Sequence, residues 1–492
     1  MLSIVERAAG FGDEPAVEDA DGSHSYADLL EVSLSMARVL LRGRGDLEEA
    51  RVAFMIPPSF EHVAWQWAIW RAGGIAVPIP LTHPPAEIEH LLDDARPELV
   101  VAGDGYRDTL DPLLAERFLP LVDVRARGDR PAVTPDVGPR RRAMMLYTSG
   151  TTGSPKGVVT THAAIEAQIR SLVEAWEWSA LDRILLVLPL HHIHGIVNVV
   201  GCTLWSGALC EIFPRFDPSQ TWKRIGEGKL TLFMAVPTIY HRLITSWEGA
   251  SPSERQQLSA GCRSLRLMVS GSAALPVPVL ERWKEISGHT LLERYGMTEI
   301  GMALSNPLHG ERGPGSVGSP LPNVEVRLVD EAGRPVPDGV PGEIQVRGPT
   351  LFSEYWERPD ATDEAFVDGW FRTGDVASRL GDVYRILGRE SVDIIKSGGE
   401  KLSALEIEEV LLAHHAVAEA AVVGVADEEW GQRVLAAVVA RSPVDGNQLE
   451  GWCRSLLAPH KVPKAFHFVE SLPRNAMGKV SKPELVALLM GK

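Results

Sequence analysis

The sequence predicts an α/β protein. We expect a large N-terminal domain of doubly wound, mostly parallel sheets with a β-rich subdomain, followed by a smaller α+β C-terminal domain. Three observations predict this class: strand-like runs alternate with helical stretches up to about residue 300, a period-two pattern follows Pro320, and a shorter mixed unit follows Arg389. The expected domains are 1–388, with the β-rich part at about 320–388, and 389–492.

The alternation begins with a helix that has an N-terminal capping pattern. Ser25 precedes this helix and Asp28 stands three residues further on, so both side chains can bond backbone N–H groups of the first turn. Parallel strands place their ligands beyond their carboxyl ends, so we expect the chemistry in the loops after the strands. The strands are expected at 51–56, 74–79, 143–147, 183–188, 232–236, 267–270 and 290–295, with helices at 61–71, from about 161, after 188, at 238–247 and at 276–286.

The pattern changes in the last third of the chain. Residues 324–329 and 343–347 alternate with period two around the turn-rich stretch 330–341, which is typical of an antiparallel sheet. The unit after Arg389 combines both periodicities, and a domain boundary is therefore expected near this residue. Its elements are expected as helices at 404–413, from 447 and at the C-terminus, and strands at 420–425, 434–440 and 465–469.

Composition excludes several classes of protein. The formal net charge is −16, which opposes binding to a nucleic-acid backbone. The four cysteines show no CxxC spacing, and they suit buried thiols in a reducing compartment, so a cytoplasmic location is expected. No secretory signal and no apolar run long enough to span a membrane are evident. The oligomeric state is left open.

A loop rich in glycine and hydroxyl groups follows the strand at 143–147, and we expect it to join that strand to a helix. Glycines let backbone N–H groups face an anion, and hydroxyls and a lysine add donors, so the loop could cradle nucleotide phosphates. It is not a Walker A loop, because Lys156 is preceded by Pro155 and followed by Gly157. A plain flexible turn is the alternative. The donors are Thr148, Ser149, Gly150, Thr151, Thr152, Gly153, Ser154 and Lys156.

With four further segments, this loop resembles the motifs of the adenylate-forming superfamily of acyl-CoA synthetases, firefly luciferases and peptide-synthetase adenylation domains. The resemblance implies a two-step reaction in which ATP and a carboxylate give an acyl-adenylate and pyrophosphate, and a thiol, usually that of coenzyme A, then takes the acyl group. The match spans most of the chain. The motifs are Tyr147–Gly157, Arg294–Glu299, Gly369–Asp375, Gly388–Arg389 with Ser397–Lys401, and Pro473–Lys479.

The resemblance also implies roles for acidic and basic residues. Glu299, just past a strand, is a hard oxygen ligand suited to Mg²⁺ on ATP phosphates, together with Thr151. Asp375, which we expect in a turn after Gly374, would accept hydrogen bonds from the ribose hydroxyls. Lys479 resembles the mobile catalytic lysine, and Lys156 is expected to assist it. The alternatives are that Glu299 is a solvated loop glutamate, that Asp375 forms an Asx-turn, and that Lys479 is a solvated lysine.

Other motif residues are assigned to ligands through the same resemblance. Arg389 is expected to open the small domain and to contact the ribose, and the pivot after it, within 390–393, is not identified. A hinge there would let the mobile small domain present Lys479 and then the stretch Ser397, Gly398, Gly399 and Glu400, which borders the approach of coenzyme A. The nucleotide-binding set is completed by Ser270, Gly271, Ser272, Glu293, Tyr295, Gly296, Met297 and Thr298.

Arg294 bears on the identity of the acid. On its strand, Arg294 points to the face opposite Glu293, so these neighbours are poor partners. A buried arginine facing a fatty chain is costly, whereas a second substrate carboxylate could pair with it bidentately. The stretch from Glu293, with the later 314–318, looks like malonyl-CoA synthetases, so malonate or methylmalonate is expected. The alternative is a structural ion pair.

Three histidines in the stretch 191–194 stand near the expected carboxylate entrance. His192 and His194 are expected to line it, His192 with a catalytic contact, and Ser272 is expected to donate a hydrogen bond to the substrate. A zinc site is disfavoured because no Glu or Cys stands at ligand spacing, and plain loop histidines remain the alternative.

Other functions left open for the whole protein are a short- or medium-chain monocarboxylate CoA ligase, an adenylation enzyme loading a carrier protein, and a nucleotide-binding sensor.

Overall fold

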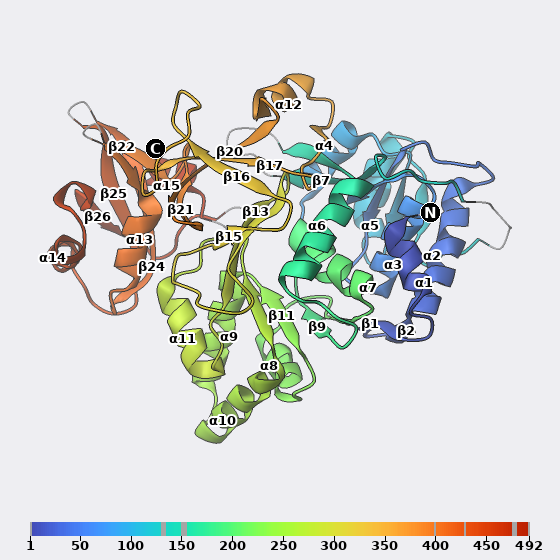
Figure 1. The fold of residues 1–492 in the computed structure, drawn as a ribbon, viewed down its shortest axis with the longest axis horizontal. Coiled ribbons are helices and arrows are strands. Elements are labelled where there is room, and N and C mark those ends of the chain that lie inside the picture. The colour runs from blue at the N-terminus through green and yellow to red at the C-terminus, as the bar shows by residue number, and fades with distance from the viewer. Residues whose placement is uncertain are drawn as a thin grey trace.

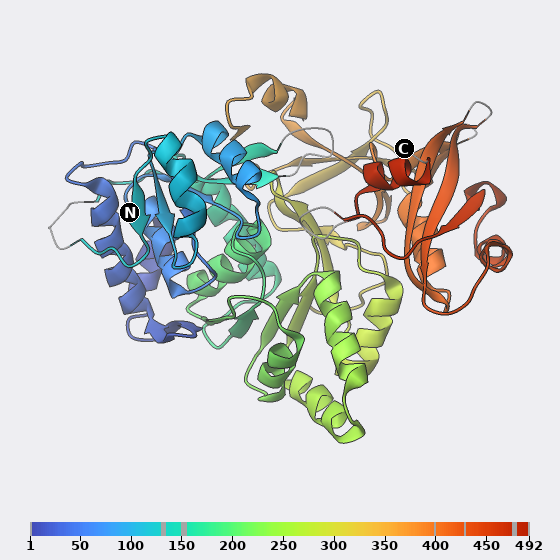
Figure 2. The ribbon, with the colours of Figure 1, turned by 180° about the vertical axis from the view of Figure 1, so that it is seen from behind.

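The structure is a computed structural model that describes residues 2–128, 134–148, 155–397, 400–427, 430–474 and 480–490. Three parts follow one another along the molecule, and the C-terminal strands and helices form a lobe at the end opposite the N-terminus (Figures 1 and 2). No helix in these described ranges is long and apolar enough to cross a membrane.

The first large sheet has seven strands within the described residues, in the order β18-β8-β7-β4-β3-β5-β6. The five strands from β7 to β6 run parallel, as expected, while β8 and β18 are added antiparallel at one edge. The strands are β3 (Arg51–Met55), β4 (Ile75–Pro78), β5 (Leu99–Ala102), β6 (Leu121–Asp123), β7 (Arg142–Thr148), β8 (Lys156–Thr161) and β18 (Glu354–Tyr355).

The second large sheet has nine strands in the described chain, in the order β15-β14-β13-β12-β11-β9-β10-β1-β2. Its interior from β13 to β1 is parallel, and antiparallel strands close both edges. The strands are β1 (Pro15–Asp19), β2 (Gly22–Ser25), β9 (Arg183–Leu186), β10 (Leu209–Ile212), β11 (Leu232–Ala235), β12 (Leu267–Ser270), β13 (Leu292–Met297), β14 (Gly301–Ser305) and β15 (Ser319–Pro320).

The helices of this region pack on the two sheets. Ser25 caps α2 with the reciprocal bonds to Asp28 that the sequence predicts. α3 is buried almost all round, and its Trp65 and Trp70 donate to the carbonyls of Val124 and Ala143, both at 2.7 Å. The helices are α1 (Ser3–Ala9), α2 (Tyr26–Leu41), α3 (Phe60–Arg71), α4 (Pro85–Ala95), α5 (Arg107–Glu116), α6 (His162–Ala175), η1 (His194–Gly201), α7 (Cys202–Ser206), α8 (Pro218–Gly226), α9 (Pro237–Gly249), α10 (Pro252–Gly261), η2 (Cys262–Ser264) and α11 (Val277–Ser287).

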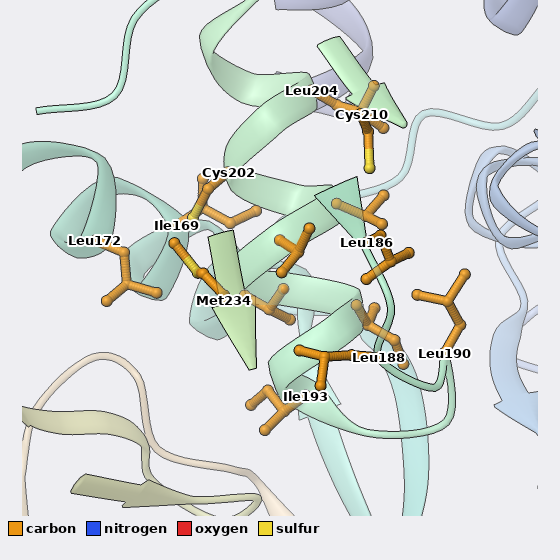
Figure 3. Close-up of a cluster of buried hydrophobic side chains, with 14 of the residues drawn as sticks. Ile169, Leu172, Leu186, Leu188, Leu190, Ile193, Cys202, Leu204, Cys210 and Met234 are labelled. Atoms are coloured by element: carbon orange, nitrogen blue, oxygen red, sulfur yellow. The ribbon is translucent and has the colours of Figure 1, made fainter. Parts of the chain in front are cut away.

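The core of the nine-stranded sheet fixes the helical segment after β9. In Figure 3, Leu188, Leu190 and Ile193 lie among side chains from α6, β9, β11 and α7. The segment then continues as the π-helix η1, a rare geometry that is frequent at functional sites. His194 is its first residue, so this histidine is not in a plain loop.

The β-rich part and the C-terminal part each contain one further sheet. The first, in the order β16-β17-β20-β19 with β21 on β20, is antiparallel throughout; the second, β23-β22-β25-β24, adds β26 parallel to β25. The elements are β16 (Glu325–Val329), β17 (Gly342–Arg347), α12 (Pro359–Ala365), β19 (Phe366–Val367), β20 (Trp370–Leu380), β21 (Val383–Arg389), β22 (Ile394–Ser397), β23 (Glu400–Ser403), α13 (Ala404–Leu412), β24 (Val417–Asp427), β25 (Gly431–Ala440), α14 (Gly446–Leu456), η3 (Pro459–Lys461), β26 (Ala465–Phe468) and α15 (Lys482–Leu489).

Candidate active site

The expected phosphate loop lies between two antiparallel strands. β7 ends at Thr148 and β8 begins at Lys156, and these two residues pair across the ladder. The expectation that the loop leads from a strand into a helix was therefore wrong: β8 intervenes, and α6 begins only at His162. Ser149, Gly150, Thr151, Thr152, Gly153 and Ser154 lie outside the described residues.

Both ends of this hairpin are held by contacts from elsewhere in the chain. The hydroxyl of Tyr147 donates to Asp94 at 2.8 Å, and burial with this neighbouring carboxylate raises the pKa of Tyr147. At the other end, the backbone N–H of Trp356 donates to the carbonyl of Gly157 at 2.7 Å. The strand ends that frame the loop are thus fixed on both sides.

Three residues expected at the nucleotide, two of them at its ribose, meet in one network. The carboxylate of Asp375 accepts a hydrogen bond from the hydroxyl of Tyr295 at 2.6 Å and another from Nε of Arg389 at 2.9 Å. Burial and the Asp375 charge raise the pKa of Tyr295, so its hydroxyl stays protonated and donates. The network joins β13, β20 and β21, and it leaves lone pairs of Asp375 available for a further donor.

The backbone around this network differs from two expectations. Asp375 lies inside β20 and not in a turn; the β17–β20 ladder passes from Glu343 opposite Val376 to Gln345 opposite Arg372, which leaves Asp375 in an irregular stretch after a left-handed Gly374. Arg389, expected to open the small domain, is the last residue of β21 and pairs with Asp375. The domain boundary at this residue stays a prediction.

Glu299 lies in the turn between β13 and β14, just past the strand end, as expected. It is 5% exposed, and burial raises the pKa of its carboxyl group against the opposing effect of a hydrogen bond from Tyr355. The hydroxyl of Tyr355 donates to Oε1 of Glu299 at 3.1 Å. The ring of Tyr355 also lies under Nζ of Lys156, at 4.9 Å from the ring centroid.

Arg294 lies inside β13, one residue past the end of its ladder with β12, and is almost fully buried. It is 3% exposed, and its guanidinium packs directly on the backbone of Gly271, where an added Cβ would lie 2.4 Å from Cζ. Burial lowers the pKa of Arg294 to about 10, so it remains a cation at neutral pH. Within the described ranges no carboxylate forms an ion pair with Arg294, although the charge of Glu293 raises its pKa against the effect of burial. Its Nε has no hydrogen-bond partner among those residues.

His194 and Ser272 lie beside this guanidinium. Oγ of Ser272 is 3.4 Å from an Arg294 nitrogen and 3.4 Å from Nδ1 of His194. Burial, with the charge of Arg294 nearby, holds the pKa of His194 well below its usual range, so the imidazole is neutral. Nε2 of His194 and Oγ of Ser270 are also buried without a partner in the described part of the chain. Ser272 has a left-handed φ of 69°, a strained conformation typical of functional loops.

The remaining residues expected at the nucleotide or the substrate form none of the contacts described above. Glu293 accepts a hydrogen bond from the backbone N–H of Leu275 at 3.1 Å, and burial raises the pKa of its carboxyl group to about 7. His192 is half-buried before η1, with its ring 4.2 Å from that of His191. Gly296 and Met297 end β13, and Thr298 lies in the turn before Glu299.

The residues expected at coenzyme A lie in the C-terminal sheet. Ser397 and Glu400 pair across the β22–β23 hairpin, and Ser397 also pairs with Gly431 of β25. Gly398, Gly399 and the expected catalytic Lys479 lie outside the described residues. The residues on either side of the segment that carries Lys479 are described, and two of them, Arg474 and Val480, form a β-bridge.

Sequence analysis did not identify Tyr355 as part of the site. The aromatic-rich stretch from Phe352 to Trp356 could have been read as a short strand by its composition, but nothing in it indicates a contact with Glu299 or Lys156. Those contacts arise because β18 pairs with β8, far away in sequence.

The chain was compared with known proteins. Residues 4–356 match the family model of the AMP-binding enzyme, and residues 406–479 match that of the AMP-binding enzyme C-terminal domain. The mouse protein named mitochondrial malonate–CoA ligase ACSF3 is 46% identical, covering 99% of this chain and 91% of that protein.

Two solved structures are also similar. ATP-bound MatB from Rhodopseudomonas palustris superimposes with a TM-score of 0.89 at 34% identity, covering 98% of each chain. A malonyl-CoA ligase in a ternary product complex with methylmalonyl-CoA and AMP gives 0.71 at 37% identity, covering 96% of this chain and all of that one. With the family model matched over residues 4–356 and these full-length likenesses, the chain belongs to the family of AMP-binding enzymes.

Proposed function

We propose that the chain is an ATP-dependent acid–thiol ligase that activates malonate or methylmalonate as an acyl-adenylate, releases pyrophosphate and transfers the acyl group to coenzyme A. Relatives named malonate–CoA ligase extend over nearly the whole chain, and MatB and malonyl-CoA ligase are among its structural neighbours. The observation in this chain that carries the proposal is the buried guanidinium of Arg294, which no described carboxylate pairs with.

The choice of a dicarboxylate follows from the cost of that guanidinium. A buried cation without an anionic partner is destabilising, and an apolar acyl chain beside it would leave it unpaired. One carboxylate of malonate reacts with ATP, and the other can accept charge-assisted hydrogen bonds from Arg294. The neutral His194 and the hydroxyl of Ser272 supply further hydrogen-bonding groups beside it.

In the first half-reaction, a carboxylate oxygen attacks the α-phosphorus of ATP, the bond to the bridging oxygen breaks, and pyrophosphate leaves with the electron pair. Both reactants are anions, so cations must offset their repulsion. We propose Lys156 and Lys479 for this task, the latter on the resemblance of its motif. Asp375 is proposed to accept the ribose hydroxyls, because Tyr295 and Arg389 hold its carboxylate in place.

Mg²⁺ is proposed to bind with the ATP phosphates at Glu299, with Thr151 as a further ligand. The donor set fits, because Mg²⁺ in nucleotide sites takes one or two carboxylates and completes its sphere with phosphates and water. Among the described residues no cluster of three or more His, Cys, Asp or Glu could hold a metal by itself, and Glu299 supplies one buried carboxylate. When bound, the ion supplies positive charge beside the phosphates.

In the second half-reaction, the thiol sulfur of coenzyme A attacks the acyl carbonyl carbon, and AMP leaves with the electron pair of the acyl–phosphate bond. We propose that Ser397, Gly398, Gly399 and Glu400 border the path of the thiol. This requires the domain 389–492 to move against the domain 1–388. The chain passes from the β-rich sheet to the C-terminal sheet through residues 390–393, and we place the hinge there.

We also propose a cytoplasmic location for the protein. The four cysteines are buried free thiols, which suits a reducing compartment, while the mammalian relatives carry the word mitochondrial in their names. Fractionation of the source cells would test it.

Pyrophosphate release is the first measurement. The purified protein is given ATP, Mg²⁺ and one of malonate, methylmalonate, acetate or octanoate, each with and without coenzyme A. We expect sustained turnover that depends on coenzyme A with the dicarboxylates. Equal or better turnover with acetate or octanoate would contradict the proposed substrate and retain the ligase class, and release with none of the four acids would contradict the proposal.

A further inference from the structure

One side chain, Tyr355, touches two parts of the site that come from different sheets. Its hydroxyl donates to Oε1 of Glu299 at 3.1 Å, and its ring lies under Nζ of Lys156 at 4.9 Å. Glu299 follows β13 of the nine-stranded sheet, and Lys156 begins β8 of the seven-stranded sheet. The distance between these two charged groups therefore depends on how the two sheets are held together.

Tyr355 lies at the end of a short strap that joins these sheets. The strap comprises residues 350–356. At its start, the hydroxyl of Thr350 donates to the carbonyl of Ile300 and the backbone N–H of Phe352 donates to the carbonyl of Glu299, both at 2.8 Å. At its other end, β18 pairs antiparallel with β8, with Tyr355 opposite Val158. The strap thus fixes the backbone on which Tyr355 stands at both sheets.

Packing holds the ring of Tyr355 in one orientation. The ring contacts Phe352 edge-on, with the centroids 4.8 Å apart, and Phe352 itself packs on Phe366 and Phe371. A ring held in this way presents its hydroxyl in a defined direction at small entropic cost. Its pKa is raised by burial and by the Glu299 charge, so the hydroxyl remains a donor.

We propose that Tyr355 is a positioning residue for adenylation, which orients the Glu299 carboxylate through its hydroxyl and the Lys156 ammonium through its ring. The inference rests on the proposed ATP-dependent ligase function and adds a residue to it. Groups that hydrogen-bond a metal-ligating side chain fix its direction, and their loss typically lowers metal affinity about 10-fold to 100-fold. The two contacts of Tyr355 make separate predictions, because a phenylalanine keeps the ring and loses only the hydroxyl.

The test is the binding of α,β-methylene-ATP to the full chain. Calorimetry measures the affinity once in Mg²⁺ and once in EDTA. For Tyr355→Phe, we expect the gain in affinity on adding Mg²⁺ to fall about tenfold, with unchanged affinity in EDTA. For Tyr355→Leu, which also removes the ring, we expect weaker binding in EDTA as well, because Lys156 is displaced.

Tyr384→Phe is the matched control. Tyr384 is a buried tyrosine of the β-rich sheet whose hydroxyl donates to the carbonyl of Val326 at 3.2 Å, and its loss should leave the Mg²⁺ gain unchanged. An undiminished Mg²⁺ gain in Tyr355→Phe, or an equal loss in Mg²⁺ and EDTA, would overturn the inference alone. Absence of nucleotide binding by the wild-type protein would overturn the proposed function together with it.

Discussion

At the scale of single residues, Arg294 is the side chain whose surroundings depend most on a ligand. Its guanidinium fills the space that Gly271 leaves, so it cannot withdraw from the pocket without a cost in packing. Its hydrogen-bond partner Ser272 and the neighbouring His194 are neutral, and Glu293, the described carboxylate whose charge acts on it, forms no ion pair with it. A second substrate carboxylate would balance the charge of Arg294, and this sets the expected effect of substitution.

We predict that Arg294→Ala lowers kcat/KM for malonate by about 100-fold or more, because the loss of a buried charged partner costs about 3 kcal/mol. Arg294→Lys should recover only part of this loss, because a lysine cannot form two parallel hydrogen bonds with a carboxylate. Steady-state kinetics of pyrophosphate release with malonate and with acetate measure both variants. Equal losses for the two acids would contradict the role of a second-carboxylate partner.

The sequence predicts Arg294 and misses Tyr355 for a physical reason. A cation on an apolar strand that leads to a ligand-binding edge is unusual in itself, and the period-two rule gives the side on which it points. Tyr355 is an ordinary aromatic residue, and its role depends on the long-range pairing of β18 with β8, which no local pattern encodes. The assignments of His192, Lys479 and the other ligand-contacting residues stay predictions.

At the scale of elements, most buried parallel strands of the two large sheets are predicted, whereas β5, β10 and the antiparallel strands added beyond the parallel ones are not. β3, β4, β11 and β12 are continuous apolar runs because both faces of the sheet are covered, and they lie where the sequence places them. β8, β14 and β18 extend the two sheets antiparallel beyond the parallel strands and interrupt the expected alternation with helices. Missing β8 led to the wrong expectation for the loop after Thr148.

A buried ion cluster ties α15 to the rest of the C-terminal domain. Nζ of Lys482 lies 2.6 Å from Asp393 and 2.8 Å from Glu408 of α13, and Lys482 is 8% exposed. The Glu408 carboxylate also accepts the backbone N–H of Val422 at 2.8 Å. The cluster thus joins the hinge segment, α13, β24 and the helix that follows residues 475–479.

We predict that Lys482→Met destabilises the C-terminal domain by about 3–5 kcal/mol, because two carboxylates would remain buried without their cation. Lys461→Met is the matched control: its Nζ lies at a similar distance, 2.7 Å, from Glu406, but this pair is partly exposed, so its loss should cost about 1 kcal/mol or less. Hydrogen exchange of α13 and α15 amides in the full-length protein measures both. Similar amide protection in the two variants would contradict the prediction that the buried cluster contributes more to stability than the partly exposed pair.

At the scale of the whole molecule, the arrangement of the two domains resembles that of an ATP-bound relative. The TM-score is 0.89 with ATP-bound MatB and 0.71 with the malonyl-CoA ligase product complex, although the latter is slightly more identical in sequence. A difference in domain arrangement would give a lower score at higher identity. We infer that the present arrangement serves adenylation and that thioester formation requires movement about residues 390–393.

The turn at the hinge makes this movement testable. The backbone N–H of Val392 donates to the carbonyl of Arg389 at 3.1 Å, and the N–H of Arg389 donates to Oδ2 of Asp393 at 3.0 Å. Val392→Pro removes one of these donors and restricts the backbone dihedrals of both Val392 and Ser391, which limits the conformations that the hinge can adopt. We expect the large domain, in which we propose the ATP site, to keep its structure.

We predict that Val392→Pro slows thioester formation from malonyl-adenylate and coenzyme A by about tenfold or more and affects adenylation much less. The reason is that the substitution impedes the domain movement, which only thioester formation requires. Single-turnover measurement of each half-reaction separates the two effects. Val392→Ala keeps the N–H and the freedom of the hinge, so both of its rates should stay close to wild type. If Val392→Pro slowed the two half-reactions equally, the hinge would not be the element that distinguishes them, and the domain movement would have to occur elsewhere in the chain.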